Sequence, residues 1–350
     1  MYWRYAVRRI LYAVVMYAIV IFIFSALFNA VAETTQMAQI TEQVNAESRG
    51  VQQASQMRPE EIQQWRADRR TQLIQQYHLD EPIVSRIFWR TLNTLTFNLG
   101  QSTQIRSSAG ENDVWLVIKE RIPRTLILFM TAVVIDVLIG VWLGLRKARK
   151  AGGLMDRTTS IVTMVLYGLP SWWLGMLMIM IFAFTFPIFP SGSMHSTPAP
   201  TGALANFVDL LYHMALPVIA LVLLRFWGRA YITRNIVLGT LQEDFIMSAR
   251  ARGITERKVL YGHTLRSSAP PIVTMSLLAL LASFGGALIF EGIFSWPGMG
   301  NLYWVAVQQN DVPVLMGNLA LTTGLYIAGL ALLDLIYGLL DPRVKVGGKA

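Results

Sequence analysis

The sequence is 350 residues long, 54% of them hydrophobic and only 15% charged, and its mean hydropathy is +0.44. Because soluble globular domains carry roughly 25% charged residues, this composition excludes an ordinary soluble protein and indicates a membrane protein. The net charge of +9 is explained better by membrane orientation than by nucleic-acid binding. No cysteine is present, which excludes disulfides and thiolate metal sites.

Six apolar runs predict an all-α, polytopic membrane protein with six transmembrane helices. A helix needs about 20 mostly apolar residues to cross the hydrocarbon core. The runs, in chain order, are residues 10–32, 125–145, 158–186, a weaker run that starts near Phe207 and passes Pro217 before Arg225, then 267–290 and 312–333.

The first run resembles a secretory signal peptide, since Arg4, Arg8 and Arg9 precede it and an A-x-A site begins at Ala30. The apolar core of a cleaved signal is about 7 to 15 residues long, and this run is well beyond that length. We therefore interpret the first run as a retained membrane anchor.

Lysine and arginine are unevenly distributed among the connections between the runs. They are concentrated before the first run, in 146–157, in 250–266 and at the C-terminus, whereas 188–206 and 292–311 contain neither. Because positively charged short loops stay in the cytoplasm, we expect a multi-pass protein of the cytoplasmic (inner) cell membrane with both termini in the cytoplasm.

This orientation divides the chain into four parts. They are the cytoplasmic N-terminus with the first helix at 1–32, an external segment at 33–118, a five-helix core at 119–342 that includes a cytoplasmic loop at 240–266, and a cytoplasmic tail at 343–350.

The external segment has the composition of a soluble domain. In it, PEEIQQWRADRRTQLIQQYHL predicts a helix, with Pro59 at the first helical position, acids in the first turn and bases later. A small cap or amphipathic section is expected near PIVSRIFWRTLNTLTF. A solvated lid without a ligand and a ligand-binding role are equally consistent with this segment.

Motifs for catalysis and nucleotide binding are absent from the sequence. No G-x-x-x-x-G-K-[ST] phosphate loop occurs, so the chain is not expected to hydrolyse ATP by itself. No H-E-x-x-H occurs either, and the four scattered histidines, His78, His195, His213 and His263, do not indicate a metal site. Ser193 lies close to His195 but lacks a Gly-flanked turn and a partner acid, so a hydrolase is not expected.

Asp136 lies in the middle of the second apolar run, where an ionisable side chain is costly and therefore a candidate for function. It is a candidate for the transport pathway, or for proton coupling in a secondary carrier. A structural ion pair is the favoured alternative, and Arg225 and Arg229 lie one turn apart on the fourth run. Gly140 and Gly144 have the spacing of a close helix–helix contact.

The stretch DFIMSARARGITERKVLYGH, residues 244–263, is polar and arginine-rich between two apolar runs. Thr240 and Glu243 have capping-box spacing and predict the start of a short helix, which Gly253 is expected to end in a left-handed cap. A second short helix, TERKVLYGH, completes a helix-turn-helix elbow. The small residues within 248–253 favour docking against another protein over lipid, which rewards bulky apolar side chains.

This stretch resembles the cytoplasmic coupling loop of ABC importer permeases, whose motif is E-A-A, three residues, G, nine residues and I-x-L-P. Ala249, Gly253 and Leu265 match it at the required spacing. SARARGITERKVLYGHTLR resembles the dipeptide/oligopeptide branch, in which a His and an Arg stand where His263 and Arg266 do. RIPRTLIL, PSWWLGM, FEGIFSWPGMGNL and DLIYGLLDPRV agree with that branch.

The resemblance implies a type I ABC importer permease fold with an external insertion between helices 1 and 2, and no enzymatic site of its own. The loop would dock on a cytoplasmic ATPase subunit and turn nucleotide-driven closure into helix rotation. The implied coupling residues are Asp244, Phe245, Met247, Ser248, Ala249, Arg250, Arg252, Gly253, Arg257 and His263. The candidate external gate is a turn formed by Trp296, Pro297, Gly298 and Met299, for which a purely structural turn is the alternative.

The resemblance also implies partners. They are a second permease subunit, usually a different chain, two ATPase subunits that hold ATP and Mg, an external substrate-binding protein and the lipid bilayer. No cofactor bound by this chain and no nucleic acid is expected. The expected cargo is di- and oligopeptides. The alternatives are the same transporter class carrying an oligosaccharide, nickel or another small solute, a proton-coupled secondary carrier, and a membrane-bound enzyme.

Overall fold

All regular structure in residues 2–54 and 58–340, which the computed structural model describes, is helical except for one isolated bridge between Gln101 and Asp113. The expected cytoplasmic tail at 343–350 lies outside the described residues. The chain divides into two units, Met1–Glu120 with Leu302–Ala350, and Arg121–Asn301. The boundaries between the units fall within two helices, α5 (Val114–Arg149) and α13 (Met299–Gln308).

Among the described residues, five helices are long and apolar enough to cross a membrane. They are Trp3–Leu27, Val114–Arg149, Ala203–Leu241, Glu256–Gly285 and Val312–Leu335. A bent pair, Leu154–Tyr167 and Ser171–Thr185, makes a sixth if it counts as one span. The prediction of an all-α, multi-pass membrane protein is therefore confirmed.

The third apolar run is bent rather than straight. α6 (Leu154–Tyr167) and α7 (Ser171–Ile179), which continues as the π-helical segment Met180–Thr185, are inclined by 97°. Gly168 and Pro170 lie in the break. Because the residue before a proline disfavours the helical conformation, the helix ends there and a new one begins at the proline. Hydropathy does not reveal this bend, since the whole run is uncharged.

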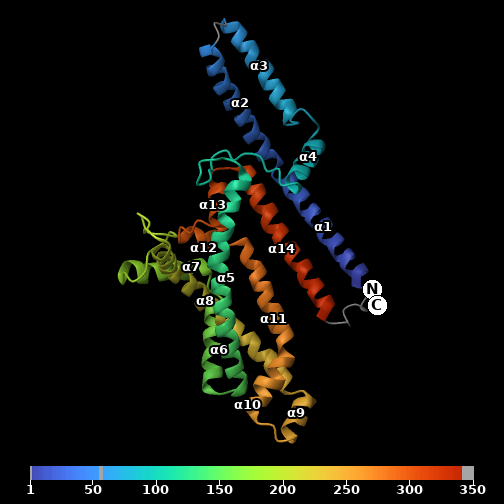
Figure 1. Cartoon of the computed structure of the whole chain (residues 1–350), viewed down its shortest axis with the longest axis vertical. Coiled ribbons are helices and arrows are strands. Elements are labelled where there is room, and N and C mark those ends of the chain that lie inside the picture. Colours follow the sequence, from blue (N-terminus) through green and yellow to red (C-terminus); the bar gives the residue numbers. More distant parts are fainter. Residues whose placement is uncertain (1, 55–57, 341–350) are drawn as a thin grey trace. The chain divides into compact units, whose positions relative to one another are not determined.

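In the first unit, α2 (Asn29–Ala54) and α3 (Pro59–Gln76) lie side by side as an antiparallel hairpin (Figure 1). The core of the hairpin is formed by Ile40, Val44, Leu73 and Leu79. Pro59 begins α3, and the amphipathic helix α4 (Ile83–Leu95) follows, as predicted. α4 exposes apolar side chains at Val84, Phe88 and Leu92, which is the face that a helix on a membrane surface presents.

The same unit contains the first and last helices of the chain. α1 (Tyr2–Leu27) packs along α14 (Val312–Leu340). The Tyr17 hydroxyl donates a hydrogen bond to the carbonyl of Ala320 at 3.1 Å. A Cβ on Gly324 would lie 3.3 Å from the Tyr17 ring, so glycine allows the close approach of the two helices.

Asp311, at the start of α14, holds the loop that leads into α5. Its buried carboxylate accepts hydrogen bonds from Ser102 Oγ at 2.5 Å and from the backbone N–H groups of Thr103 and Gln104 at 3.0 and 3.1 Å. The other carboxylate oxygen accepts from the N–H of Val314. One buried carboxylate thus closes the loop and caps the helix.

In the second unit, α8 (Ala203–Leu241) packs against α6, α7 and α11 (Leu265–Ala282). The fifth apolar run was expected to continue to residue 290, but the helix α11 ends at Ala282. A short 3₁₀ turn and Gly286, with φ 64°, change the direction of the chain there. The short helix α12 (Leu288–Ile293) follows. The core of this unit includes the large side chains of Leu128, Phe129, Leu216, Leu221, Phe290, Phe294 and Trp296.

Gly140 and Gly144 on α5 face α8 at close range, as their spacing predicts. A Cβ on Gly140 would lie 2.8 Å from the Cβ of Arg229, and a Cβ on Gly144 would lie 2.7 Å from the Cβ of Thr233. Real Cβ contacts are longer than this, so only glycine permits the observed packing of α5 on α8.

Candidate functional site

The stretch 244–263 forms a helix-turn-helix elbow at one end of the second unit (Figure 1). α9 (Asp244–Ala251) is followed by α10 (Glu256–Lys258) and the π-helical segment Val259–Thr264, which runs directly into α11. Gly253 has φ 75°, and the N–H of Ile254 donates to the carbonyl of Ala249, which is the pattern of a Schellman cap. The predicted elbow and its left-handed cap are confirmed.

The predicted capping box at Thr240 is wrong. α8 continues to Leu241, so Thr240 is still helical and its hydroxyl donates to the Ile236 carbonyl at 3.2 Å. That hydroxyl also accepts a hydrogen bond from Ser268 Oγ at 2.9 Å, which joins the end of α8 to α11. Glu243 is the N-cap residue of α9, and its side chain makes no capping hydrogen bond.

α9 has a buried face and an exposed face. Ile246 and Ala249 are buried and hold α9 against the segment Val259–Thr264, so Ala249 seats the helix rather than offering a surface. Phe245 and Met247 are 45% and 59% exposed, although they are large and apolar. The other residues predicted for coupling are exposed as well, namely Asp244, Ser248, Arg250, Arg252, Gly253, Arg257 and His263.

An ion pair closes the elbow from outside. Arg250 Nε on α9 lies 2.8 Å from Glu256 Oε1 on α10. The cap at Gly253 sets the turn between the two short helices, and this exposed ion pair spans it. The elbow therefore presents a preformed surface of apolar and basic groups, which costs little conformational entropy when a partner binds.

Asp136 is fully buried and pairs with Arg229 of α8 through two hydrogen bonds, from Nε and from Nη2, the latter at 3.3 Å. The structure therefore has the ion pair that the sequence suggested as the alternative to a pathway role. A paired carboxylate at this depth links α5 to α8. The role of Asp136 in the transport pathway stays a prediction.

The turn at 296–299 is ordered and packed into the second unit. The indole Nε1 of Trp296 donates to the carbonyl of Arg124 at 2.8 Å, and the N–H of Met299 donates to Thr125 Oγ1 at 2.7 Å. A Cβ on Gly298 would collide with Thr125 and would lie 2.8 Å from the carboxyl carbon of Glu291. The predicted turn is present, and its role as an external gate stays a prediction.

Glu291 is the residue at this turn that the sequence analysis missed. It is fully buried, and its carboxylate accepts hydrogen bonds from Thr125 Oγ1 at 3.0 Å and from the N–H of Asn301 at 3.1 Å. Burial raises the pKa of Glu291 to about 7, although these hydrogen bonds favour the charged form. The sequence signal that could have identified Glu291 is its place as an acid inside the apolar stretch LIFEGIF.

We expect the Glu291 carboxyl to make stability depend on pH. A free glutamate loses its proton near 4.5 and this one near 7, so between these values the folded state binds more protons and stability falls as pH rises. Glu291→Gln removes the titration. Between pH 5 and pH 8, the unfolding temperature of the wild type should therefore fall by roughly 5 °C relative to that of the variant. Thermal unfolding in detergent measures this difference. Parallel pH profiles would contradict this assignment.

The expectation that His195 lacks a partner acid is wrong. Asp209 on α8 lies 3.0 Å from His195 Nδ1, and it accepts hydrogen bonds from the hydroxyl and the N–H of Ser196 at 2.6 and 3.0 Å. Ser193 Oγ, however, donates to the carbonyl of His195 and not to its imidazole. This cluster anchors the loop that precedes α8 to that helix and does not have the geometry of a hydrolase site.

Comparison with known proteins gives consistent matches. The family model described as binding-protein-dependent transport system inner membrane component matches residues 136–346. The dipeptide transport system permease protein DppB of Escherichia coli (strain K12) is 30% identical over 295 residues, which cover 79% of this chain and 86% of the relative. The oligopeptide transport system permease protein AppB of Bacillus subtilis (strain 168) is 28% identical over 277 residues, or 79% of this chain and 85% of the relative. The dipeptide transport system permease protein DppB of the same organism is 31% identical over 273 residues, or 78% and 83%.

Proposed function

Because the chain belongs to the family of binding-protein-dependent transport system inner membrane components, we propose that it is the permease subunit of an ABC importer that moves di- and oligopeptides into the cell. The observation that carries this proposal is the preformed elbow at 244–263, which exposes Phe245 and Met247 beside basic side chains. The matched relatives are named for dipeptide or oligopeptide transport, which supports a peptide as the cargo.

In this proposal, energy comes from two cytoplasmic ATPase subunits that bind ATP and Mg, and the elbow docks on one of them. The sequence carries no phosphate loop of its own, which supports an external source of energy. A second permease subunit completes the pathway, and an external binding protein delivers the peptide. Both termini and the elbow lie in the cytoplasm, and the lysine-free and arginine-free connections 188–206 and 292–311 lie outside.

The turn at 296–299 is then a rigid part of the external end of the permease rather than a hinged flap. Trp296 is buried and the turn is bonded through Thr125 and Glu291, so it moves together with α5 and α12. The ion pair of Asp136 with Arg229 gives the carboxylate a fixed partner. This disfavours the proton-coupled carrier, which needs a carboxylate that is free to gain and lose a proton.

Reconstitution of the assembled complex tests this function. The permease is purified with its ATPase subunits, its second permease subunit and its binding protein, and placed in liposomes. We expect uptake of labelled peptide that requires ATP and the binding protein. Mass spectrometry of the ligand that co-purifies with the binding protein should find peptides. Recovery of a sugar or nickel would overturn the cargo, and uptake that survives removal of the ATPase subunits would overturn the importer.

A further inference from the structure

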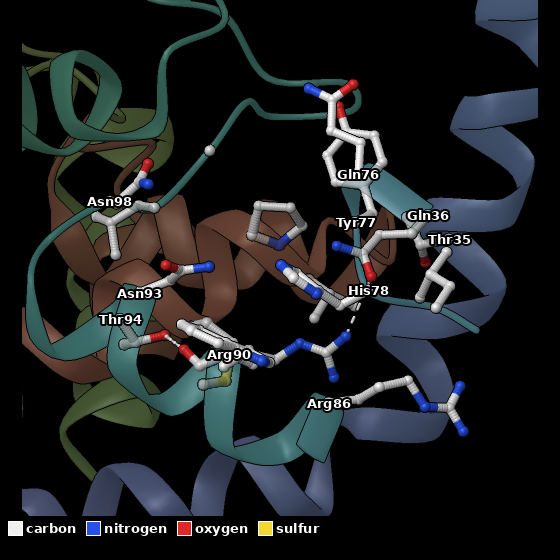
Figure 2. A pocket seen from close by; sticks show the side chains of 17 residues that line it. Thr35, Gln36, Gln76, Tyr77, His78, Arg86, Arg90, Asn93, Thr94 and Asn98 are labelled. Carbon is white, nitrogen blue, oxygen red and sulfur yellow. Dashed lines mark hydrogen bonds between the residues drawn. The ribbon is translucent and has the colours of Figure 1, made fainter. Parts of the chain in front are cut away.

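A cavity of about 300 Å³ lies in the first unit and shares no lining residue with the elbow or with the turn at 296–299. The end of α3, the helices α2 and α4, and the start of α14 enclose it, and Figure 2 shows polar side chains from several of them turned toward it. Its wall contains two arginines, several amide side chains and an aromatic pair, and no lining residue in the described part of the chain is acidic. This volume is at the lower end of the range for small-molecule sites.

Within the described residues, the two arginines of the wall differ in their hydrogen-bond partners. Arg86 forms an ion pair with Glu33 at 2.9 Å. Arg90 instead donates to neutral amide oxygens, to Asn29 Oδ1 at 2.7 Å and to Gln36 Oε1 at 3.1 Å. Burial lowers the pKa of Arg90, but a guanidinium keeps its charge at any physiological pH. Glu33 is thus bonded to Arg86, whereas the hydrogen bonds of Arg90 go to neutral amide groups.

The Arg90 side chain is held in place by the two amide contacts and keeps further N–H groups for a ligand. A guanidinium carries five N–H donors, and these two hydrogen bonds use only part of them. Figure 2 shows the side chain extended across the cavity toward Gln36, with Arg86 nearby at the edge. A fixed, planar set of donors suits a carboxylate, which accepts two parallel hydrogen bonds.

A stacked aromatic pair forms another wall. The His78 imidazole lies on the Trp89 ring, with centroids 5.1 Å apart and planes inclined by 13°. His78 Nδ1 is 2.6 Å from Glu81 Oε1, which fixes the imidazole from the side. His78 also has φ 56°, a left-handed conformation that non-glycine residues adopt rarely and that often occurs where a side chain is held for binding.

We propose that this cavity binds a short peptide by its C-terminal carboxylate. Arg90 contacts the carboxylate, the amides of Gln36 and Asn93 serve the peptide groups, and the pair of His78 and Trp89 covers the apolar part. Amide side chains can both donate to and accept from a peptide bond, and the planar guanidinium of Arg90 fits a single carboxylate. The choice of a peptide among organic carboxylates rests on the proposed function.

The binding test uses the complex of permease and ATPase subunits in phosphatidylcholine nanodiscs, without the binding protein. The probe is radiolabelled trialanine, compared with its C-terminal amide. We expect the amide to bind at least about tenfold more weakly, because it lacks the charge-assisted hydrogen bonds. Arg90→Gln should weaken trialanine binding to a similar extent. The matched control is Arg70→Gln, an exposed arginine on α3 outside the cavity, which should bind as wild type does.

Arg90→Gln could lose binding through a folding defect, since Arg90 also contacts Asn29 and Gln36. A second variant controls for this outcome. Asn93→Trp fills the cavity and leaves those contacts in place, and it should abolish trialanine binding while the unfolding temperature stays near that of wild type. Equal affinity for trialanine and its amide, or wild-type affinity in both Arg90→Gln and Asn93→Trp, would overturn the proposal.

A phospholipid headgroup is the competing source of an anion. Adding phosphatidylglycerol to the nanodiscs should leave trialanine binding unchanged, and competitive displacement by this lipid would assign Arg90 to a headgroup and overturn the peptide site. Peptide uptake by the fully assembled wild-type transporter is measured in parallel. If uptake is normal but the nanodisc complex does not bind trialanine, only the proposed peptide site in the cavity is contradicted. If ATP-driven uptake fails, the proposed function itself is contradicted.

Discussion

Asp136→Ala is expected to lower the free energy of unfolding by about 3–5 kcal/mol, because it leaves the Arg229 guanidinium buried without a carboxylate partner. Denaturant titration of the purified protein in detergent measures this loss, and ATP-driven uptake should fall with the amount of folded permease. The control is Asp334→Ala. Asp334 pairs with Arg9 at 3.1 Å but is 35% exposed, so its removal should cost at most about 1 kcal/mol.

The double variant Asp136→Leu with Arg229→Met separates a structural ion pair from a proton carrier. Replacing a buried pair with apolar side chains of similar size is often neutral or stabilising. We therefore expect the double variant to recover most of the stability that Asp136→Ala loses, together with ATP-driven uptake. A stable but inactive double variant would show that the carboxylate itself takes part in transport. Asp136→Ala by itself cannot distinguish a structural carboxylate from a proton-carrying one, because both roles predict a loss of uptake.

Phe245→Ala is expected to reduce ATP-driven uptake and the retention of ATPase subunits by roughly tenfold or more. Phe245 is an aromatic side chain that α9 exposes beside its arginines, and single aromatic anchors of this kind often contribute about 2 kcal/mol or more to an interface. Co-purification of the ATPase subunits with the tagged permease measures the contact. The ratio of peptide transported to ATP hydrolysed in liposomes measures the coupling.

Tyr261→Ala is the matched control for Phe245→Ala. Tyr261 is 44% exposed, against 45% for Phe245, and it lies on the π-helical segment of the same elbow but is not among the residues predicted for coupling. We expect its uptake to stay within about twofold of wild type. If both variants lose uptake equally, the contact is spread over the elbow; if neither loses any, the proposed docking surface is refuted.

Features that depend on neighbouring residues were predictable from the sequence. Proline and the early acids placed the start of α3 at Pro59, and glycine placed the end of α9 at Gly253. The spacing of Gly140 and Gly144 indicated a close contact, which the structure places against α8. The capping box at Thr240 failed because α8 continues through it, and a two-residue pattern does not reveal that continuation.

Partners that are distant in sequence were not predictable. Glu291 was not predictable as part of the site, because its role depends on Thr125 and on the turn that follows it. Asp209 was not connected with His195, because no spacing rule links an acid on α8 to a histidine in the preceding loop. The cavity at Arg90 is assembled from four helices, so no local pattern indicates it.

By itself, the sequence determined that this is a helical, multi-pass membrane protein with a basic elbow after its fourth span. Hydropathy, charge asymmetry and capping act over one or two helical turns, and they can be read locally. The tertiary structure alone decided which buried charges are matched. Asp136 meets a guanidinium 93 residues away and Glu291 a hydroxyl 166 residues away, while Arg90 donates to an amide oxygen of α2. The reason is physical: a buried charge is stable only beside its partner, and packing, not spacing, chooses that partner.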